Sequence, residues 1–400
     1  MISRQEAVAI AAGAAQPVAV EEIEIAAASG RVLAETLTAQ ADLPPFDRCL
    51  RDGYAVRASD TGQAPVVLRV AGTALAGRVA SGGTPPGSCW RVMTGAPLPD
   101  GTDAVVMEEE AEGHASGSVR IQRQVPFGAY VGRAGAEVRS GDALAAAGLR
   151  IDPPALALAL ACGRQRVRVH RLPRVAVLST GSELVPPADT PGAGRIRASN
   201  PWMLASAIER AGARADNLGI VPDAEEALRS GVEKGLGGDM LVMSGGTGRG
   251  QADLTRRTLE ACGVEILFQG VAIDPGRPVL CGRRAATLVL GLPGTPLAAW
   301  ILWHVLAVPC LRRLAGESRW DLRLGPARLA SPLEHPRRVE VWAPVELSWA
   351  GGERVARPRS SRGAGTLRQH IGAPGLVRIP PGDTDRTPAG ALVEVLEERG

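Results

Sequence analysis

Three stretches of this sequence combine hydroxyl side chains with glycines, and that combination suits the binding of an oxyanion. The stretches are STGSEL (179–184), SGGTGRGQAD (244–253) and LPGTPLA (292–298). Glycines let backbone amides approach a ligand closely, hydroxyls add further donors, and the N-terminus of a helix adds positive potential. A phosphate is the expected ligand, although a nucleotide or sugar-phosphate enzyme would need the same donors, so this chemistry alone does not name the ligand.

The candidate binding residues all follow apolar runs of the sequence. Four glycines in the six positions 245–250 are more than a plain turn needs, whereas helix capping alone can explain Asp253 and the PGTP turn can simply begin a helix. No lysine completes a Walker A loop here, and the loop has no G-x-G-x-x-G pattern. The residues expected to bind the ligand are Thr180, Gly181, Ser244, Gly245, Gly246, Thr247, Gly248, Asp253, Pro293, Gly294 and Pro296.

Three carboxylates stand in glycine-containing loops: Glu183 in STGSEL, Asp52 in RDGYA and Glu137 in RAGAEVRSGD. Each has an ordinary explanation. Asp-Gly favours tight turns, and a glutamate in a loop is usually solvated. The position of Glu183 just after a strand, beside the other two loops, favours a role in the same site.

An α/β domain over residues 172–318 is expected to hold these loops. Strands are predicted at 174–178, 214–221, 239–243, 264–273 and 285–290, alternating with helices at 201–211, 223–236, 252–262 and 296–314. This alternation predicts a three-layer domain with a parallel sheet. Parallel strands end at one edge of their sheet, so the three stretches should line one crevice there.

The rest of the chain is expected to form three further domains, which makes the fold class multidomain α/β plus β. Residues 21–136 alternate short β-runs with turns such as GGTPPG and predict a β-rich domain. Residues 319–400 show period-two alternation, typical of a small β-barrel or sandwich. Helices within 1–20 and 137–171 are expected to pack together as a discontinuous helical domain.

Composition excludes several classes of function. With 45 basic and 42 acidic residues the net charge is only +3, which is not typical of a nucleic-acid-binding protein. Six cysteines form no C-x-x-C pair, so a reduced, cytoplasmic protein is expected. The N-terminal SRQE capping box predicts a helix and not a signal peptide. The apolar run 296–311 is too short for a bilayer and is predicted to be a core or subunit-interface helix.

Six segments in order resemble the MoeA/gephyrin E-domain family, the molybdopterin molybdenumtransferases. They are FDRCLRDGYAVR, VMTGAPLPDGTDAVVMEE, VAVLSTGSEL, the SGG loop, VAIDPGRP and GLPGTP. The resemblance covers nearly the whole chain. It implies a homodimer of four-domain elongated subunits, with an active site between the α/β domain of one subunit and the β-rich domain of the other. It also implies that molybdate is inserted into adenylylated molybdopterin with release of AMP, assisted by Mg²⁺.

The resemblance also assigns residues. Asp52 matches the acidic residue of the family's DGYA motif, Glu183 that of its STG(D/S)EL motif, and Glu137 falls where the family usually has Asp. In a cleft built for oxyanions these carboxylates suit Mg²⁺ or the positioning of a water, so Asp52, Glu137 and Glu183 are the candidate catalytic residues, with Asp52 and Glu183 as candidate Mg²⁺ ligands. Arg277 is expected to hold the oxyanion. Molybdopterin adenylyltransferase and apo-molybdoenzymes are the expected protein partners, with no nucleic acid and no membrane.

The sequence departs from the family where the oxyanion should bind. The family's K-P-G-K-P segment reads here as Asp274-Pro-Gly-Arg277-Pro, its P-G-N-P-V-S segment ends at Ala298, and Ala343 and Ala364 align where the family has an Arg and a Ser. Replacing a cation by Asp274 reverses the electrostatic preference for an anion. An alternative function is therefore a molybdopterin or molybdenum-cofactor carrier that does not insert the metal.

Overall fold

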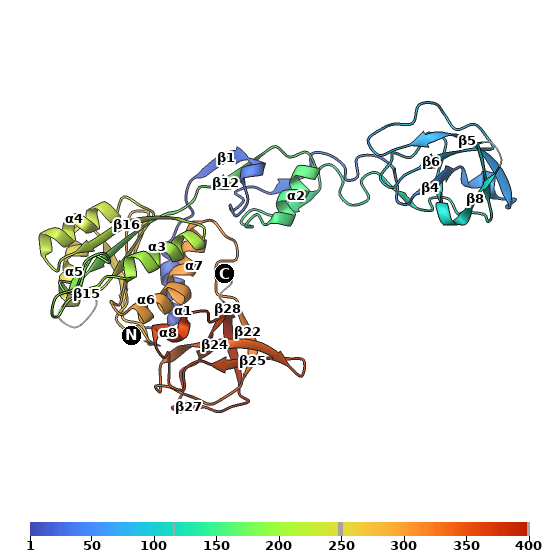
Figure 1. The fold of residues 1–400 in the computed structure, drawn as a ribbon. Helices are drawn as coiled ribbons and strands as arrows, with labels where there is room; N and C mark the ends of the chain where they lie inside the picture. The colour runs from blue at the N-terminus through green and yellow to red at the C-terminus, as the bar shows by residue number, and fades with distance from the viewer. Residues whose placement is uncertain (115–116, 247–250, 398–400) are drawn as a thin grey trace.

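The protein is an elongated molecule with a β-rich region at one end and a larger body at the other (Figure 1). The computed structural model describes residues 1–114, 117–246 and 251–397, without the side chains of residues 114 and 251–253. A small middle region connects the two ends (Figure 1). The larger body consists of a central sheet with its helices and a C-terminal barrel.

The central sheet has six strands in the order β16 (Arg214–Val221), β13 (Arg174–Thr180), β17 (Met240–Ser244), β21 (Thr287–Leu292), β20 (Leu280–Arg284) and β18 (Glu265–Gln269). The first four are parallel, and the last two are antiparallel to their neighbours. The predicted parallel arrangement of the three loop-bearing strands is therefore confirmed. Strand β20 was not expected, because Ala285, with φ 52°, occupies a turn position where glycine is the usual signal.

Helices cover both faces of this sheet. α3 (Asn200–Arg210), α6 (Pro296–Leu302) and α7 (Val308–Leu314) share one apolar core with Val175 and Val177. α4 (Glu225–Gly235) and α5 (Gln251–Ala261) lie on the other face, where α4 and Leu259 of α5 share a core with Ala176 and Leu178. Alternate residues of β13 thus point to opposite cores, as the pleat of a strand requires.

The segment from α6 through the π-helix η4 (Trp303–Ala307) to α7 is a core helix. Within the described residues it is the one helix that is long and apolar enough to span a membrane, but 67% of its apolar stretch is buried inside the protein. This burial is typical of the centre of a globular domain.

The N-terminal helix α1 (Arg4–Ala14) corrects one expectation. Its capping box forms, with the Ser3 hydroxyl accepting from the Glu6 amide, but the helix packs on α7 and not on the helix of the middle region. Ala7, Val8 and Ala11 join the core of the α/β domain. A short alanine-rich face fits many apolar surfaces, so its partner could not be inferred from its pattern.

Buried charges join α1 to the C-terminal barrel. The Arg4 Nε donates to the Glu340 Oε1 at 2.5 Å, and Arg378 donates to the other oxygen at 2.8 Å. The Trp342 indole N–H also donates to the Glu340 Oε1 at 2.8 Å. Arg4 and Glu340 are both about 5% exposed, so the network lies inside the protein.

The middle region contains β1 (Val20–Glu24), η1 (Ile25–Ala27), β2 (Leu37–Thr38), β11 (Ala143–Ala145), α2 (Pro153–Ala161) and β12 (Arg166–His170). β1 pairs antiparallel with β12, and β2 pairs with β11. Residues 21–38, expected in the β-rich domain, therefore belong with residues 143–170. This strand was not predicted, because its sequence VEEIE contains three glutamates and gives no clear apolar alternation.

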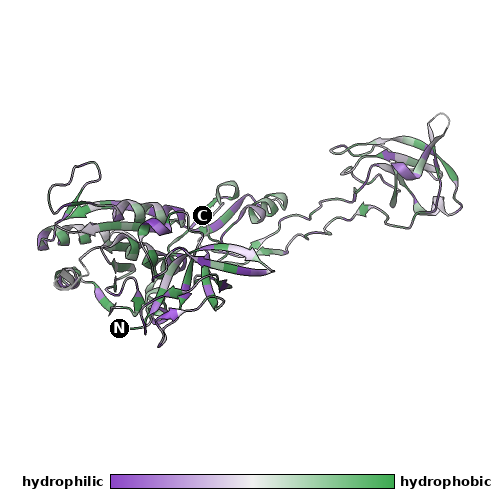
Figure 2. Ribbon diagram, turned by 60° about the horizontal axis from the view of Figure 1, so that its bottom comes forward, coloured by the Kyte–Doolittle hydropathy of each residue, from purple (hydrophilic) through white to green (hydrophobic). Residues whose placement is uncertain are grey.

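The β-rich region is a six-stranded sheet between residues 53 and 121. Its order is β7 (Ala104–Met107), β4 (Gly53–Val56), β6 (Ser88–Val92), β5 (Val66–Ala74), β9 (Ser118–Ile121) and β8 (Ala111–His114), with η2 (Ala58–Thr61) and η3 (Glu108–Glu110) between strands. Two chain segments run side by side to this sheet (Figure 2). They are bridged at Leu43 and Val138 and again where β3 (Arg48–Cys49) pairs with β10 (Val131–Gly132).

The C-terminal region contains the expected barrel. Five strands close in the order β24 (Glu340–Ala350), β25 (Glu353–Pro358), β22 (Leu324–Leu329), β28 (Leu392–Glu397) and β26 (Gly375–Ile379), and β26 pairs back to β24. β19 (Ile273–Asp274) of the α/β domain pairs with the start of β24. The pair β23 (Leu333–Glu334) and β27 (Arg386–Thr387) and helix α8 (Leu367–His370) complete this region.

Candidate functional site

The three glycine-containing loops meet at one edge of the central sheet. Ser179, near the end of β13, is in register with Ser244 at the end of β17, which is in register with Leu292 at the end of β21. The hydroxyls of Ser179 and Ser244 are 2.6 Å apart and buried. The sequence prediction that these loops share an edge is confirmed.

The first loop is fixed by a carboxylate that the sequence did not single out. The Thr180 hydroxyl donates to the Asp223 Oδ1 at 2.6 Å, and the Ser182 amide donates to the Asp223 Oδ2 at 3.0 Å. Asp223 follows β16, the fourth parallel strand, and so lies at the same edge. A polar residue directly after a predicted strand is the signal that could have identified it.

Glu183 lies in this first loop, in the turn before the short parallel pair β14 (Leu184–Val185) and β15 (Ile196–Arg197). Its side chain is exposed and bends back over Gly181, where an added Cβ would lie 2.8 Å from the Glu183 Oε2. Because Gly181 has no side chain, the Glu183 carboxylate can occupy the space beside it.

The second loop begins with two glycines, and any other residue at either position would have to displace neighbouring atoms. Gly245 has φ 93°, and a Cβ there would lie 2.1 Å from the Thr180 carbonyl oxygen. Gly246 has φ 65°, and its Cβ would lie 2.3 Å from the Thr255 Oγ1. Thr247 and Gly248 lie outside the described residues, as does the side chain of Asp253, whose backbone belongs to α5.

The third loop packs against the second. A Cβ on Gly294 would lie 3.3 Å from the Gly245 Cα, and the Gly245 amide donates to the Leu292 carbonyl at 3.1 Å. The Asn200 Nδ2 donates to the Gly294 carbonyl at 2.9 Å, while the buried Asn200 Oδ1 has no hydrogen-bond donor within the described residues. Pro293 is buried, and Pro296 begins α6 after the N-cap residue Thr295.

Asp52 lies in the β-rich region, far from this edge in the same chain (Figure 1). Its Oδ1 accepts from the hydroxyl and the amide of Thr94, at 2.7 and 2.6 Å. These hydrogen bonds, with a smaller contribution from Arg91, lower the pKa of Asp52. The carboxylate is therefore ionised, exposed and fixed in orientation.

Glu137 lies on one of the two segments that connect the regions. Its amide donates to the Leu43 carbonyl at 3.0 Å, and its side chain is exposed. Burial raises the pKa of the Cys162 thiol at the end of α2, and the Glu137 carboxylate adds to that shift. One chain thus does not bring Asp52, Glu137 and Glu183 together, and its described residues contain no cluster of three metal-ligating side chains.

The predicted oxyanion residues lie between the sheet and the barrel. Arg277 is exposed, and its backbone carbonyl accepts from the amides of Val271 and Val279. Asp274 is partly buried; burial raises its pKa and the Arg277 guanidinium counteracts that rise. Ala298, Ala343 and Ala364 are all buried.

Comparisons with known proteins agree with this architecture. The family described as "MoeA N-terminal region (domain I and II)" matches residues 2–163, and "Probable molybdopterin binding domain" matches residues 176–313. A molybdopterin molybdenumtransferase of Haemophilus influenzae is 33% identical over 305 residues, which are 76% of this chain and 75% of the relative. Molybdopterin molybdenumtransferase 2 of Mycobacterium tuberculosis is 33% identical over 386 residues, covering 93% and 94%.

Solved structures agree as well. Two crystal structures of the molybdopterin biosynthesis MoeA protein from Pyrococcus horikoshii have TM-scores of 0.82 and 0.83 with this chain, at 33% and 26% identity. Both alignments cover 99% or more of each chain.

Proposed function

The chain belongs to the MoeA family of molybdopterin molybdenumtransferases, and from this membership we propose that the loop-bearing edge of its central sheet binds adenylylated molybdopterin. Its role is in molybdenum cofactor biosynthesis, and it is a transferase. The proposed reaction inserts molybdate into the dithiolene of the pterin and releases AMP.

The single observation that carries this assignment is the glycine pair 245–246, packed between Thr180 and Gly294 at the carboxyl ends of three parallel strands. Bare backbone at such an edge can approach a phosphate closely. The Asn200 Oδ1, buried and without a donor in the described part of the chain, can accept from an N–H group of the ligand. Thr180, Gly181, Ser244, Pro293 and Pro296 support the same surface, and Thr247, Gly248 and Asp253 belong to the proposal on sequence alone.

The carboxylates fit a magnesium-assisted reaction. Asp52 uses one oxygen to accept from Thr94, and its other oxygen has no hydrogen-bond partner within the described residues. With Glu183, which is also exposed, it offers the hard oxygen donors that Mg²⁺ prefers. Bound Mg²⁺ would neutralise negative charge on the phosphoanhydride. Glu137 would position a water.

We propose a homodimer because the site is incomplete in one chain. Asp52 and the glycine loops lie at opposite ends of the molecule (Figure 1). A second copy, placed with its β-rich region over the sheet edge of the first, would bring Asp52 to the glycine loops. A two-fold arrangement would create two such sites.

The oxyanion is assigned to Arg277, which is exposed and charged. One observation favours the carrier alternative: Asp274 places a partly buried carboxylate three residues from Arg277, where it opposes the binding of an anion. A carrier would keep the pterin-binding loops and lose insertion.

Complementation of an insertase-deficient strain separates the two functions. We expect the wild-type chain to restore the activity of a molybdoenzyme and Asp52→Asn to fail, because the amide cannot replace the charge. Thr73→Val, at an exposed position of the same region, is the matched control and should restore activity. If the wild type fails but still binds molybdopterin in solution, the insertase proposal is wrong and the carrier function stands.

A cytoplasmic location belongs to this proposal. All six cysteines are free and buried, which suits a reducing compartment. The proposed protein partners are a molybdopterin adenylyltransferase, which would supply the substrate, and the apo-molybdoenzymes that would receive the product.

A further inference from the structure

A wide cavity of about 1970 Å³ lies where the middle region, the α/β domain and the barrel meet. It is lined by the last residues of α3, by α7 and by the segment 317–325, among others. α3 begins at the loop-bearing edge, where Asn200 contacts Gly294, and ends in this cavity at Arg210. Met203, in the first turn of α3, also lines the cavity, but the eleven residues of the helix span roughly 16 Å. Arg150 lies beside Gly212, just beyond the end of α3, so the arginine end of the cavity is separate from the proposed pterin site.

Positive charge is concentrated in this cavity. Seven arginines and three carboxylates line it, an excess of four positive charges, whereas the whole chain has a net charge of +3. Burial lowers the pKa of the cavity-lining His304 to about 4, so this imidazole adds no charge at neutral pH. A concave surface with one dominant sign of charge attracts ions of the other sign.

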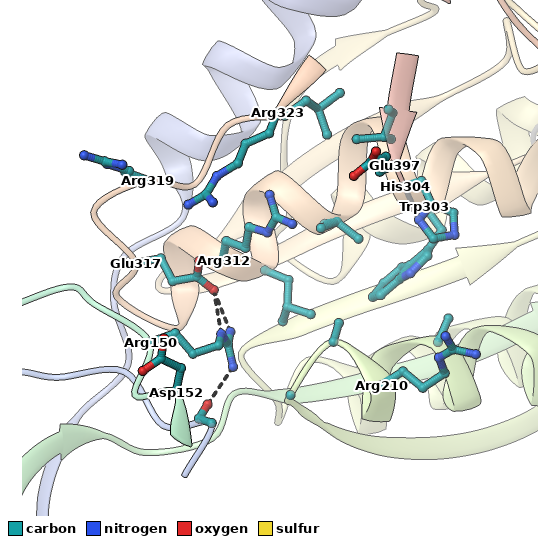
Figure 3. Close-up of a pocket in the computed structure, with 18 of the residues that line it drawn as sticks. Arg150, Asp152, Arg210, Trp303, His304, Arg312, Glu317, Arg319, Arg323 and Glu397 are labelled. Carbon is teal, nitrogen blue, oxygen red and sulfur yellow. Dashed lines mark hydrogen bonds and ion pairs between the residues drawn. The ribbon is translucent and has the colours of Figure 1, made fainter. Parts of the chain in front are cut away.

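Four of these arginines gather at one end of the cavity. Figure 3 shows Arg150, Arg312 and Arg323 near Glu317, with Asp152 beside Arg150 and with the exposed Arg319 on the same segment, its guanidinium pointing away from the others. Arg150 forms an ion pair with Glu317, donating to the Glu317 Oε1 from Nε at 3.1 Å and from a terminal nitrogen at 2.6 Å.

The remaining three arginines have no carboxylate partner among the described ion pairs. Arg312 donates only to the Asp321 carbonyl, at 3.2 Å. Burial lowers the pKa of Arg312, and the Glu317 and Asp321 carboxylates oppose this shift. Arg323 and Arg150 add to the lowering, so these guanidiniums are close enough to repel Arg312. Such crowding is unfavourable unless an anion joins the group.

The two carboxylates do not remove this excess. Glu317 is paired with Arg150, and Asp152 caps α2 by accepting from the Ala155 amide at 2.9 Å. Among the groups that line this end of the cavity, four arginines against two carboxylates leave two positive charges. Asp321 does not line the cavity but offsets part of this charge at Arg312, and the remainder still favours a phosphate or pyrophosphate group.

We propose that this end of the cavity is a second anion site, which binds a small pyrophosphate-bearing molecule through Arg312, Arg319 and Arg323. The ligand fills only this end, since the whole cavity is larger than a small ligand requires. The assignment does not depend on the proposed transferase chemistry, because it uses none of the residues of the sheet edge.

The test is titration of the full chain with inorganic pyrophosphate, with hydrogen exchange used to locate the bound ion. We expect protection of the amides of residues 308–325. Arg312→Gln/Arg323→Gln should weaken this binding at least tenfold. Arg319→Gln, a change at an exposed side chain that should not disturb folding, should weaken it about threefold.

The matched control is Arg337→Gln/Arg338→Gln, which removes the same charge from exposed barrel positions paired with Asp385 and Asp383. It should change the affinity less than twofold. Equal weakening by the two double variants would overturn the proposal, as would protection confined to residues 240–246, the pterin edge. No pyrophosphate binding, together with a fall in sedimentation coefficient in Arg312→Gln/Arg323→Gln, would overturn it in favour of contact with a second copy of the chain.

Discussion

Two threonines each hold a carboxylate of the proposed site in one orientation. Thr94 donates twice to Asp52, and Thr180 donates once to Asp223. In both pairs the partners are more than 40 residues apart in the chain. A fixed and ionised carboxylate needs less reorganisation when it meets a cation or a water.

Removal of the Thr94 hydroxyl should shift a pH profile. The hydrogen bonds from Thr94 hold the pKa of Asp52 below its usual value, so Thr94→Val should raise this pKa. Because the pKa of Asp52 is lowered in the folded wild type, its carboxylate stays ionised until the pH falls to that lowered pKa. In Thr94→Val the carboxylate should become protonated at a higher pH. The acid limb of kcat/KM for the insertion reaction should therefore move to higher pH. Thr102→Val, which removes a bond to the Pro99 carbonyl, should leave the limb in place; coincident limbs in Thr94→Val and wild type would contradict the role of Thr94.

Thr180→Val tests the other pair through stability. The valine keeps the shape of the side chain but leaves Asp223 without its hydroxyl donor, which should cost about 1–3 kcal/mol in the free energy of unfolding. Urea denaturation would measure the loss. Thr73→Val is exposed and should change stability by no more than about 0.5 kcal/mol. Equal effects of the two changes would show that the hydrogen bond contributes nothing specific.

The elements were largely predictable, and their partners were not. Apolar runs bounded by turns identified β13, β17 and β21, and their shared edge followed from the properties of parallel sheets. The contacts of Asp52 with Thr94 and of α1 with α7 depend on distant segments, which local periodicity cannot locate. β20 was missed because its turn contains Ala285 and no glycine. The roles of Asp52, Glu137 and Glu183 stay predictions, and Asp223 was overlooked although it follows a predicted strand.

The glycine loop after β17 should not tolerate a side chain. Gly246→Ala would place a Cβ 2.3 Å from the Thr255 Oγ1 at a positive φ, which should cost about 1–3 kcal/mol in stability and abolish pterin binding. Gly13→Ala is the control, because Gly13 is an exposed position in the last turn of α1 with nothing within 4 Å of an added Cβ. It should not destabilise the protein and should stabilise it by up to about 0.5 kcal/mol, less than in the middle of a helix. Thermal unfolding and pterin titration would check both, and normal binding by Gly246→Ala would contradict the proposed site.

At the scale of the whole molecule, buried charged residues connect the N-terminal helix α1 to the C-terminal barrel. Glu340 accepts from Arg4, Arg378 and Trp342 in the interface between α1 and the barrel. Glu340→Gln would leave the buried Arg4 guanidinium without a countercharge, whereas Arg378 would keep Glu394, and the change should cost about 3–5 kcal/mol in the free energy of unfolding. Glu353→Gln removes an exposed partner of Arg328 and should cost less than about 1 kcal/mol. Denaturation curves that coincide for the two variants would show that the network is not stabilising.

A mixed assembly tests the composite site directly. Chains carrying Asp52→Asn and chains carrying Glu183→Gln should each be inactive alone. After unfolding and refolding together, half of the dimers should contain both chains, and one of their two sites should be intact, which gives about one quarter of wild-type activity. No recovery in the mixture, with dimers present by sedimentation, would exclude a site shared between copies.

The paired segments that lead to the β-rich sheet have a consequence for how this protein can be rebuilt. Leu43 and Val138 lie opposite each other, so almost a hundred residues leave the body and return to it at a single place. A short hairpin could close that gap without threading or stretching the remaining backbone. The inserted sheet is thus an exchangeable cassette, and swapping it between relatives would transplant Asp52 and Thr94 as one preassembled unit.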